Sequence, residues 1–431
     1  MCDSLVARGP RTVDGSTLFA KNSDRRGREV QPFVQFSEAL HPRGTRLRCS
    51  HIEIDEVPET YRVMGHSPAW CWGFEQGVNE HGVAIGNHAT WSREALEPTQ
   101  GLIGMDLVRL GLERGRDARE ALEVIASLLE SHGQGGSAFS SEGDDGYQNS
   151  FVIADGCSAW VLETTARSWA ARSVDGAALT NALTLGADWQ IGSRDLERTA
   201  LAEGYWTRKS RLDFKAAYRL EAWPTFLTER RQEASLARLD GLPLSLGDLK
   251  SWLRDHGAGE SPPEASRASE DPDRYSVCMH ADPMSMTTAS IVMRLPEDLP
   301  ATEPWPVWIS FATPCTGIFV PVYLDGVIPP EFASAGKPDS GFGGTEASVW
   351  CAMRTLQEKA TKDFARALPI IQERWIEVER QIESERVEVE GEASIFHAAG
   401  DSGRAAGALT TFMAKNAKRI LETAANLLEE I

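Results

Sequence analysis

The sequence predicts a layered α+β protein in which helices cover the sheets. Short apolar segments separated by turn residues dominate the chain up to about residue 90. A helical period follows over residues 103–133, and strand-like segments return over 148–186. After a second strand-rich part, the chain ends in helices from about residue 342. This order of strands, helices, strands and helices is typical of sheets packed under helical layers.

The first strands read as hairpins. "SLVA" leads into Asp14-Gly15, a strong hairpin-turn signal, and "TLFAKN" returns from it. "RCSHIEI" and "YRVMGHS" give two more short strands. "AWCWGFEQGVNEHGVAIGNHAT" predicts a strand, a tight turn at "NEHG" and a second strand.

Two helices follow in "IGMDLVRLGLERG" and "DAREALEVIASLLESHG". In the second, Leu122, Ile125 and Leu129 fall on one stripe, with Asp117 as a cap and Gly133 as the end. The segment 148–186 then reads as a meander of strands with Asp-Gly turns.

The second half contains a charged helical stretch over about 190–260. Three strands are predicted in "TTASIVMRL", "PVWISFAT" and "GIFVPVYL". From about 342 onward we expect a helix, a break near 388–403, and a final helix.

Charge and composition exclude several classes of function. The net charge is −19, which disfavours nucleic-acid binding because phosphate backbones need clustered cations. No segment has the roughly 18 uninterrupted apolar residues of a membrane span, and no signal segment is recognisable. We therefore expect a cytoplasmic protein without a membrane partner. The seven cysteines contain no CxxC pair, so neither a disulfide framework nor a zinc site is predicted.

Cys2 is the most informative residue of the N-terminus. Its side chain is small, so removal of Met1 is expected, and Cys2 would then carry both a thiol and a free α-amine. The reference pKa of an α-amine is about 7.7 to 8.0, so the amine can accept the thiol proton near neutral pH. A buried and inert cysteine remains the alternative.

Three polar residues could complete such a site. The hairpin that starts at Cys2 brings Asp24, in "KNSDR", back beside it, where a carboxylate would orient the amine. Asn181 in "LTNALTLGADW" and Asn87 in "AIGNHAT" stand at strand ends, and an amide N–H₂ suits an oxyanion. Turn formation explains both asparagines equally well.

Five segments together resemble a known family. "MCDSLVA", "DGSTLFAKNSDR", "GVNEHGVAIGNHA", "ALTNALTLGADW" and "SVCMHADPMSMTTASIVMRL" are similar, in this order, to secernins and C69-type dipeptidases of the N-terminal nucleophile (Ntn) hydrolases. Penicillin acylases and bile salt hydrolases are more distant relatives. The resemblance implies a four-layer αββα sandwich over residues 1–330, with a helical insertion at about 190–260. Residues 331–431 would be a C-terminal helical extension packed on it.

The resemblance also implies the roles of individual residues. Cys2 would be the nucleophile, Asp24 the carboxylate beside its amine, and Asn181 an oxyanion donor. The segment around Asn87 would supply a second donor by its backbone. Lys21 stands where bile salt hydrolases have an arginine, so the positive charge is kept but the bidentate fork is lost. Arg211, in "KSRLDF", is a candidate counterpart of a later arginine of these relatives.

No metal and no cofactor are predicted. The spacings of the histidines do not resemble those of zinc ligands on a helix, and His280, two residues after Cys278, is interpreted as a structural hydrogen-bonding residue or a substrate contact. Packing explains the remaining histidines listed next: His51, His66, His81 and His88.

The function that fits best is a cysteine-type dipeptidase acting through Cys2 on a small peptide. Two alternatives stay open: another amide hydrolase of acylase type, and a catalytically silent, secernin-like regulatory protein. A homo-oligomer is also open, because the acidic C-terminal helices offer a surface, although a solvated helical face accounts for them as well.

Overall fold

The computed structural model describes residues 1–97, 100–139, 146–221, 227–257, 275–281, 284–297, 303–336 and 347–431. The strands of the first sheet are β1 (Cys2–Gly9), β2 (Gly15–Arg25), β14 (Gly176–Leu179), β16 (His280–Ala281), β17 (Ser285–Leu295), β18 (Val307–Phe311) and β19 (Val320–Val322). Their order is β14-β1-β2-β17-β18-β19, and β16 pairs with β17. Every pairing is antiparallel.

The second sheet is also antiparallel and has the order β15-β13-β12-β11-β10-β9-β8-β3. Its strands are β3 (Phe33–Phe36), β8 (Val63–His66), β9 (Gln76–Asn79), β10 (Ala84–Thr90), β11 (Gln148–Ala154), β12 (Ala159–Thr165), β13 (Ser168–Ser173) and β15 (Ile191–Gly192). Two short ribbons pair β4 (Ala39–Leu40) with β7 (Glu59–Thr60) and β5 (Arg46–Arg48) with β6 (Glu53–Asp55). The segment "RCSHIEI" is therefore not one strand, because the chain turns inside it between β5 and β6.

The helices fall into three groups along the chain. They are α1 (Gly104–Arg114) and α2 (Ala118–His132); α3 (Leu196–Ala202), α4 (Phe214–Tyr218), α5 (Glu229–Leu239) and α6 (Leu246–Leu253); and α7 (Pro330–Ala333), α8 (Val349–Ala360), α9 (Phe364–Ala398) and α10 (Ser402–Glu430). The predicted caps of α2 are confirmed: the Asp117 side chain accepts from the Glu120 N–H, and the helix ends at Gly133 with φ +71°. Such a φ is a conformation that glycine adopts without strain.

The two sheets pack face to face, as the alternation of side chains along each strand shows. Val6, Phe19 and Ile291 of the first sheet share a core with Val152 and Val161 of the second. Their immediate neighbours along the strands face the other way, because side chains alternate in a strand. Leu5, Leu18 and Val292 accordingly belong to a separate core on the outer face of the first sheet.

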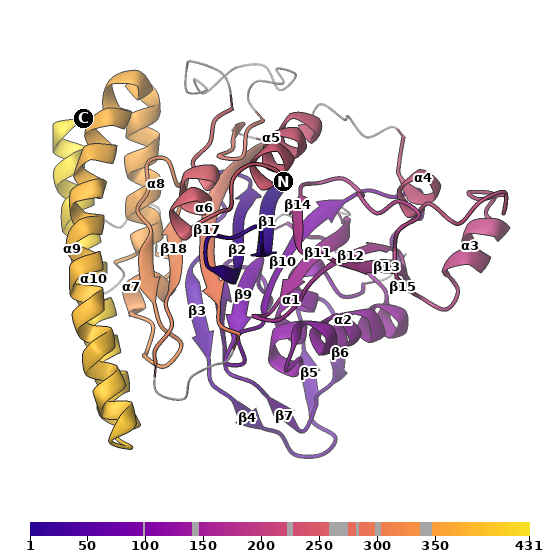
Figure 1. Ribbon diagram of the computed structural model, residues 1–431, viewed down its shortest axis with the longest axis horizontal. Helices are drawn as coiled ribbons and strands as arrows, with labels where there is room; N and C mark the ends of the chain where they lie inside the picture. Colours follow the sequence, from indigo (N-terminus) through magenta and orange to yellow (C-terminus); the bar gives the residue numbers. More distant parts are fainter. Residues whose placement is uncertain are drawn as a thin grey trace.

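Helices cover both outer faces. Leu239 of α5, with Leu249 and Leu253 of α6, packs on the outer face of the first sheet. Helices α1 and α2 pack on the outer face of the second sheet through apolar residues that include Leu107, Leu110, Leu122 and Ile125. The result is the layer order helix, sheet, sheet, helix (Figure 1), so the predicted αββα sandwich is confirmed.

Strand β14 connects the two sheets. β11, β12 and β13 form the predicted meander in the second sheet, but the chain then crosses to the first sheet, where β14 pairs with β1. Ser4 lies opposite Leu179 in this pairing. The residues that follow β14 are therefore brought to the start of β1.

The last helices stand at one end of the sandwich, where α9 and α10 run side by side next to α8 (Figure 1). Apolar residues of all three are continuous with the core between the sheets. The predicted break near 388–403 is shorter than expected, because α9 continues to Ala398 and the turn occurs at Gly400, with φ +77°. In the described residues, no helix is both long enough and apolar enough to cross a membrane.

Candidate active site

Cys2 begins β1, at the open end of the first hairpin, opposite its turn. It lies opposite Ser23 of β2, and the next pair is held by two bonds: the Asp24 N–H donates to Met1 O at 2.9 Å, and the Met1 amine donates to Asp24 O at 2.8 Å. The hairpin turn at Asp14-Gly15 sets this register, with Gly15 at φ +79°. Cys2 is only 4% exposed, and burial raises the pKa of its thiol. With Met1 present the thiol is thus buried, and burial favours its neutral form.

Asn181 follows β14 and reaches the backbone of Cys2. Its Oδ1 accepts from the Cys2 N–H at 3.0 Å and from Arg231 Nη2 at 2.9 Å, while its Nδ2 donates to Ala89 O at 2.9 Å. A guanidinium has only donors, so the side-chain oxygen must be the atom that faces Arg231 and Cys2. In this structure Asn181 therefore accepts at Cys2, whereas an oxyanion role requires it to donate.

Arg231 of α5 binds three groups around Cys2. Its Nη1 donates to Asp3 Oδ2 at 2.5 Å and to Cys2 O at 3.2 Å, in addition to the contact with Asn181. Both charged side chains are fully buried. Burial raises the pKa of Asp3, and the charge of Arg231 opposes that rise. The helical stretch after residue 190 thereby contributes directly to the surroundings of Cys2.

Asp24 lies on the other side of the N-terminus. Its Oδ1 accepts from Thr287 Oγ1 at 2.7 Å, while its Oδ2 is buried and has no hydrogen-bond partner among the described residues. Burial raises the pKa of Asp24, and the N-terminal amine and then Arg231 oppose the rise. The predicted carboxylate is therefore beside the N-terminus, with one oxygen still available.

Lys21 and Glu75 form a buried ion pair next to the thiol. Lys21 Nζ lies 3.6 Å from Glu75 Oε2, and the same oxygen lies 4.0 Å from Cys2 Sγ. Glu75 Oε1 accepts from Arg25 Nη1 at 3.0 Å. The Lys21 charge lowers the pKa of the Cys2 thiol and the Glu75 charge raises it, so the two partly cancel.

Asn87 is in β10, next to Glu75. Its side-chain nitrogen donates to Asn149 Oδ1 at 3.0 Å, and with the amide turned over the same nitrogen would donate to Glu75 Oε2 at 2.9 Å and to Glu75 O at 3.0 Å. The backbone N–H of Asn87 also donates to Glu75 O, at 3.3 Å. Asn87 therefore contacts the backbone of Glu75 and reaches the Cys2 surroundings only through that residue.

Sequence reasoning missed Arg231 and Glu75. Arg211, the arginine considered instead, is exposed, donates to Trp189 O and stacks on the Trp189 ring. The signal for Arg231 was weak, because "TERRQEASLARL" is one charged helix among several. Glu75 stands in an otherwise apolar stretch, and a single acidic residue amid apolar ones is a usable sign of a buried ion pair.

His280 belongs to a second polar group, with His256, Cys278 and Cys315. It is buried, and its ring contacts those three side chains. Among the described residues this is a set that could hold a metal ion.

Two face-to-face sheets under helices, with a cysteine at the start of a strand of the first sheet, form the αββα arrangement expected from the sequence. Residues 1–193 match the family model of Peptidase family C69. The resemblance to C69-type dipeptidases is thus confirmed for this part of the chain. The match ends before α3, so it does not include Arg231 or the His/Cys residues.

A curated relative and two solved structures are similar to the chain. Probable dipeptidase B of Lactococcus lactis is 27% identical over 188 residues, which is 39% of this chain and only 36% of that protein. Penicillin V acylase from Agrobacterium tumefaciens is 13% identical, with 75% of this chain and 86% of that chain covered and a TM-score of 0.41. The conjugated bile acid hydrolase from Clostridium perfringens, in its C2A mutant, is 16% identical, with 72% of this chain and 89% of that chain covered and a TM-score of 0.38.

Proposed function

We propose that the protein is a cysteine-type amide hydrolase that cleaves dipeptides through Cys2 after loss of Met1. The observation that carries the proposal is the fixed acceptor at the Cys2 nitrogen: Asn181 Oδ1 lies 3.0 Å from it and is itself held by Arg231. When Met1 is absent, that nitrogen is an α-amine instead of an amide. The amine then sits beside its own thiol with its orientation already set.

Loss of Met1 would also free polar atoms close to Cys2. Met1 packs against the cluster of Tyr275, Met279 and Ala281, and its amine donates to Asp24 O and Ser285 Oγ. Without Met1 these two oxygens lose that donor, and Asp24 Oδ2 already has no hydrogen-bond partner among the described residues. They suit the ammonium group of a peptide or the protonated amine of Cys2.

The chemistry then needs only groups of this chain. The Cys2 amine takes the thiol proton, sulfur attacks the scissile carbonyl carbon, and the ammonium returns a proton to the leaving amine as the C–N bond breaks. Water, deprotonated by the same amine, hydrolyses the thioester and restores the thiol. Lys21 favours the thiolate during attack, since its charge lowers the pKa of Cys2.

The test begins with the intact mass of the purified protein before and after reaction with an electrophilic thiol probe. We expect loss of Met1 and labelling at Cys2. A panel of dipeptides, N-acyl amino acids and β-lactams then separates a dipeptidase from an acylase, and dipeptides should be hydrolysed fastest. Retained Met1 with an unreactive Cys2 would instead favour the silent regulatory protein.

A further inference from the structure

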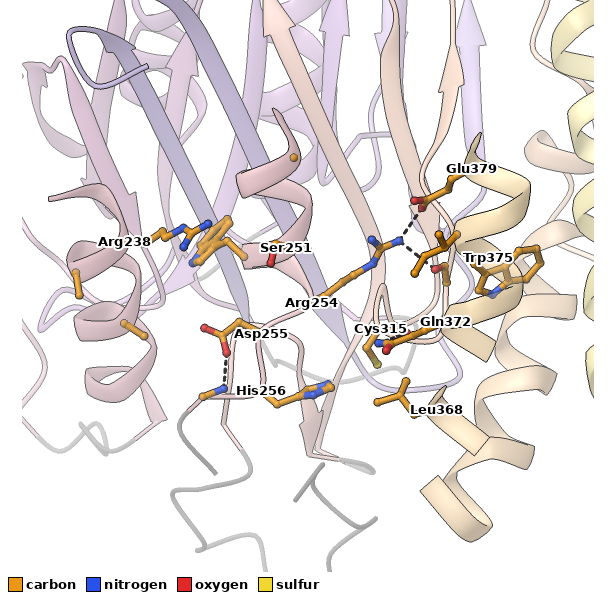
Figure 2. Close-up of a pocket in the computed structure, with 17 residues that line it drawn as sticks. Arg238, Ser251, Arg254, Asp255, His256, Cys315, Leu368, Gln372, Trp375 and Glu379 are labelled. Carbon is orange, nitrogen blue, oxygen red and sulfur yellow. Dashed lines mark hydrogen bonds and ion pairs between the residues drawn. The ribbon is translucent and has the colours of Figure 1, made fainter. Parts of the chain in front are cut away.

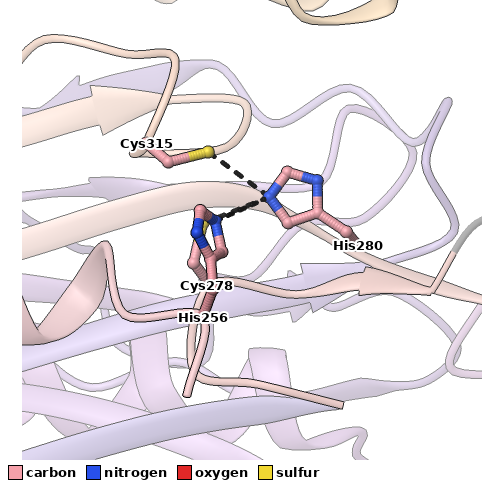
Figure 3. Close-up of side chains that lie close together, drawn as sticks. All are labelled: His256, Cys278, His280 and Cys315. Carbon is pink, nitrogen blue, oxygen red and sulfur yellow. Dashed lines mark hydrogen bonds between the residues drawn. The ribbon is translucent and has the colours of Figure 1, made fainter. Parts of the chain in front are cut away.

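The second polar group is built from three segments that are far apart in the sequence. Cys278 and His280 lie at the start of β16, His256 follows α6, and Cys315 lies in the loop after β18. Cys278, His280 and Cys315 are buried and His256 is half-buried. The ligand atoms of the four side chains lie within 4.8 Å of one another, and Figure 3 shows their hydrogen bonds meeting at the His280 ring. We call these residues the His/Cys group.

Hydrogen bonding does not explain how the four side chains converge. His280 Nε2 lies 3.3 Å from His256 Nε2, 3.5 Å from Cys278 Sγ and 3.3 Å from Cys315 Sγ. A ring nitrogen is either one donor or one acceptor, so it cannot make three such bonds well at once. Lone pairs that point at one place are instead the arrangement of a coordination shell.

The three separations measured from His280 Nε2 agree with those of tetrahedral zinc, and the other three are no longer than 4.8 Å. Zn–N bonds of about 2.0 to 2.1 Å and Zn–S bonds of about 2.3 Å place tetrahedral ligands about 3.3 Å (N to N), 3.5 Å (N to S) and 3.8 Å (S to S) apart. The N–N and N–S separations at His280 match these values, and all four ligand atoms lie within 4.8 Å of one another. Thiolate and imidazole ligands favour zinc over magnesium or calcium.

We propose that His256, Cys278, His280 and Cys315 bind one Zn²⁺ ion as a closed structural site. Four protein ligands fill a tetrahedral shell, so no position remains for a substrate or a reactive water. The site would fasten the end of α6, the start of β16 and the loop after β18 to one another. The Cys278 N–H already donates to Asp255 O at 2.9 Å, which links the first two segments.

The surroundings provide an entry path and a link to the C-terminal helices. His256 and Cys315 line a pocket of about 840 Å³, and Leu368, Gln372 and Trp375 of α9 form its other side (Figure 2). Phe364, at the start of α9, packs edge-on against His256 and His280, with ring centroids 6.1 and 5.5 Å away. A bound ion would therefore also fix the two histidine rings against which the first residue of α9 packs.

The first test measures zinc in the full-length protein, produced with added zinc, purified without chelators and then unfolded to release the metal. We expect about one zinc per chain, because such sites bind tightly at neutral pH. Cys278→Ser and Cys315→Ser should each lose most of it. Cys351→Ser, at a half-buried cysteine of α8, and Cys2→Ala should keep it.

A second measurement keeps the proposal testable if the serine variants do not fold. Co²⁺ added to the zinc-free wild type should give the intense visible absorption of a tetrahedral ion together with sulfur-to-cobalt charge transfer. The proposal would be overturned if the wild-type protein holds neither ion. It would also be overturned if mass spectrometry shows that Cys278 and Cys315 form a disulfide. The outcome does not depend on whether Cys2 hydrolyses anything.

Discussion

The Cys2 site and the His/Cys group lie next to strands of the first sheet, β1 and β16, yet their polar atoms are arranged in opposite ways. We use "Cys2 site" for Cys2, Asp3, Lys21, Asp24, Glu75, Asn181 and Arg231. It gathers charges of both signs, and Asp24 Oδ2, Lys21 Nζ and Asp3 Oδ1 stay without hydrogen-bond partners among the described residues. The His/Cys group instead brings two imidazole nitrogens and two cysteine sulfurs within 4.8 Å of one another.

The difference indicates two kinds of task. A buried polar atom without a hydrogen bond is costly even where its side chain is ion-paired, as Lys21 and Asp3 are, and such atoms persist where a ligand or reacting group binds. Converging cysteine and histidine ligands can all bind one cation, and the bound cation then holds them in a fixed geometry. The two are joined by a short relay: the Met279 N–H donates to Thr287 Oγ1 at 2.9 Å, and Thr287 donates to Asp24 Oδ1 at 2.7 Å. A metal-bound His/Cys group would thus help to hold the Asp24 carboxylate of the Cys2 site in place.

The largest expected effect is on turnover by the Cys2→Ala variant. Removal of the nucleophile should lower kcat/KM for the best dipeptide by at least about a thousandfold. Stability should fall by only about 1 kcal/mol, since a small side chain is shortened. Cys157→Ala, at the exposed cysteine, is the control and should keep full activity. Equal hydrolysis by both variants would remove Cys2 from the mechanism.

The next effect is on stability, through Arg231→Met. The substitution leaves Asp3 buried without its partner, which costs about 3 to 5 kcal/mol. Arg211→Met, at an exposed arginine between α3 and α4, removes a surface hydrogen bond and a ring contact with Trp189 and should change the free energy of unfolding by less than about 1 kcal/mol. Urea unfolding of both variants measures the difference. Matching values would mean that Arg231 adds nothing specific to the Cys2 site.

A smaller effect on activity is expected for Asp24→Asn. An amide keeps the hydrogen bond from Thr287 but cannot balance the charge of the protonated amine, so kcat should fall by about ten- to a hundredfold. Asp14→Asn, in the turn of the same hairpin, is the matched control. Zinc content should be the same in both, which separates an effect on the Cys2 site from one on the His/Cys group. An unchanged kcat in Asp24→Asn would contradict the role of the carboxylate.

The two sites also differ in how far the sequence predicts them. Cys2 and Asp24 are ends of one hairpin, so turn chemistry at Asp14-Gly15 suffices to bring them together. Asn181 could be placed near Cys2 only through the family resemblance, because β14 leaves its meander for the other sheet. No local pattern reports such a crossing.

The His/Cys group illustrates the limit of spacing arguments. Only Cys278 and His280 are close in sequence, while His256 and Cys315 arrive from α6 and from the loop after β18. A zinc pattern is recognisable when ligands come in two short pairs. Here three segments must first fold before the ligands meet. Likewise, Arg231 is an ordinary helical arginine until α5 is placed against β1 and β14.

The smallest expected effect is a shift in the pH at which Cys2 reacts. Burial favours the neutral thiol and raises the pKa of Cys2, so its thiolate forms only at higher pH than that of an ordinary cysteine. Alkylation of Cys2 behind an uncleaved N-terminal extension should therefore be slow at neutral pH and rise by about tenfold per pH unit until the raised pKa is reached.

Removal of the extension should move that profile toward neutral pH. Cys2 then carries the amine that takes its proton, and the covering residue is gone. Exposed Cys157 of the same molecules is the internal reference, because its rate should be equal in both forms. Peptide mapping of iodoacetamide-treated protein across the pH range gives both rates. A Cys2 profile that does not move would mean that the amine is not its base, even if Cys2→Ala is inactive.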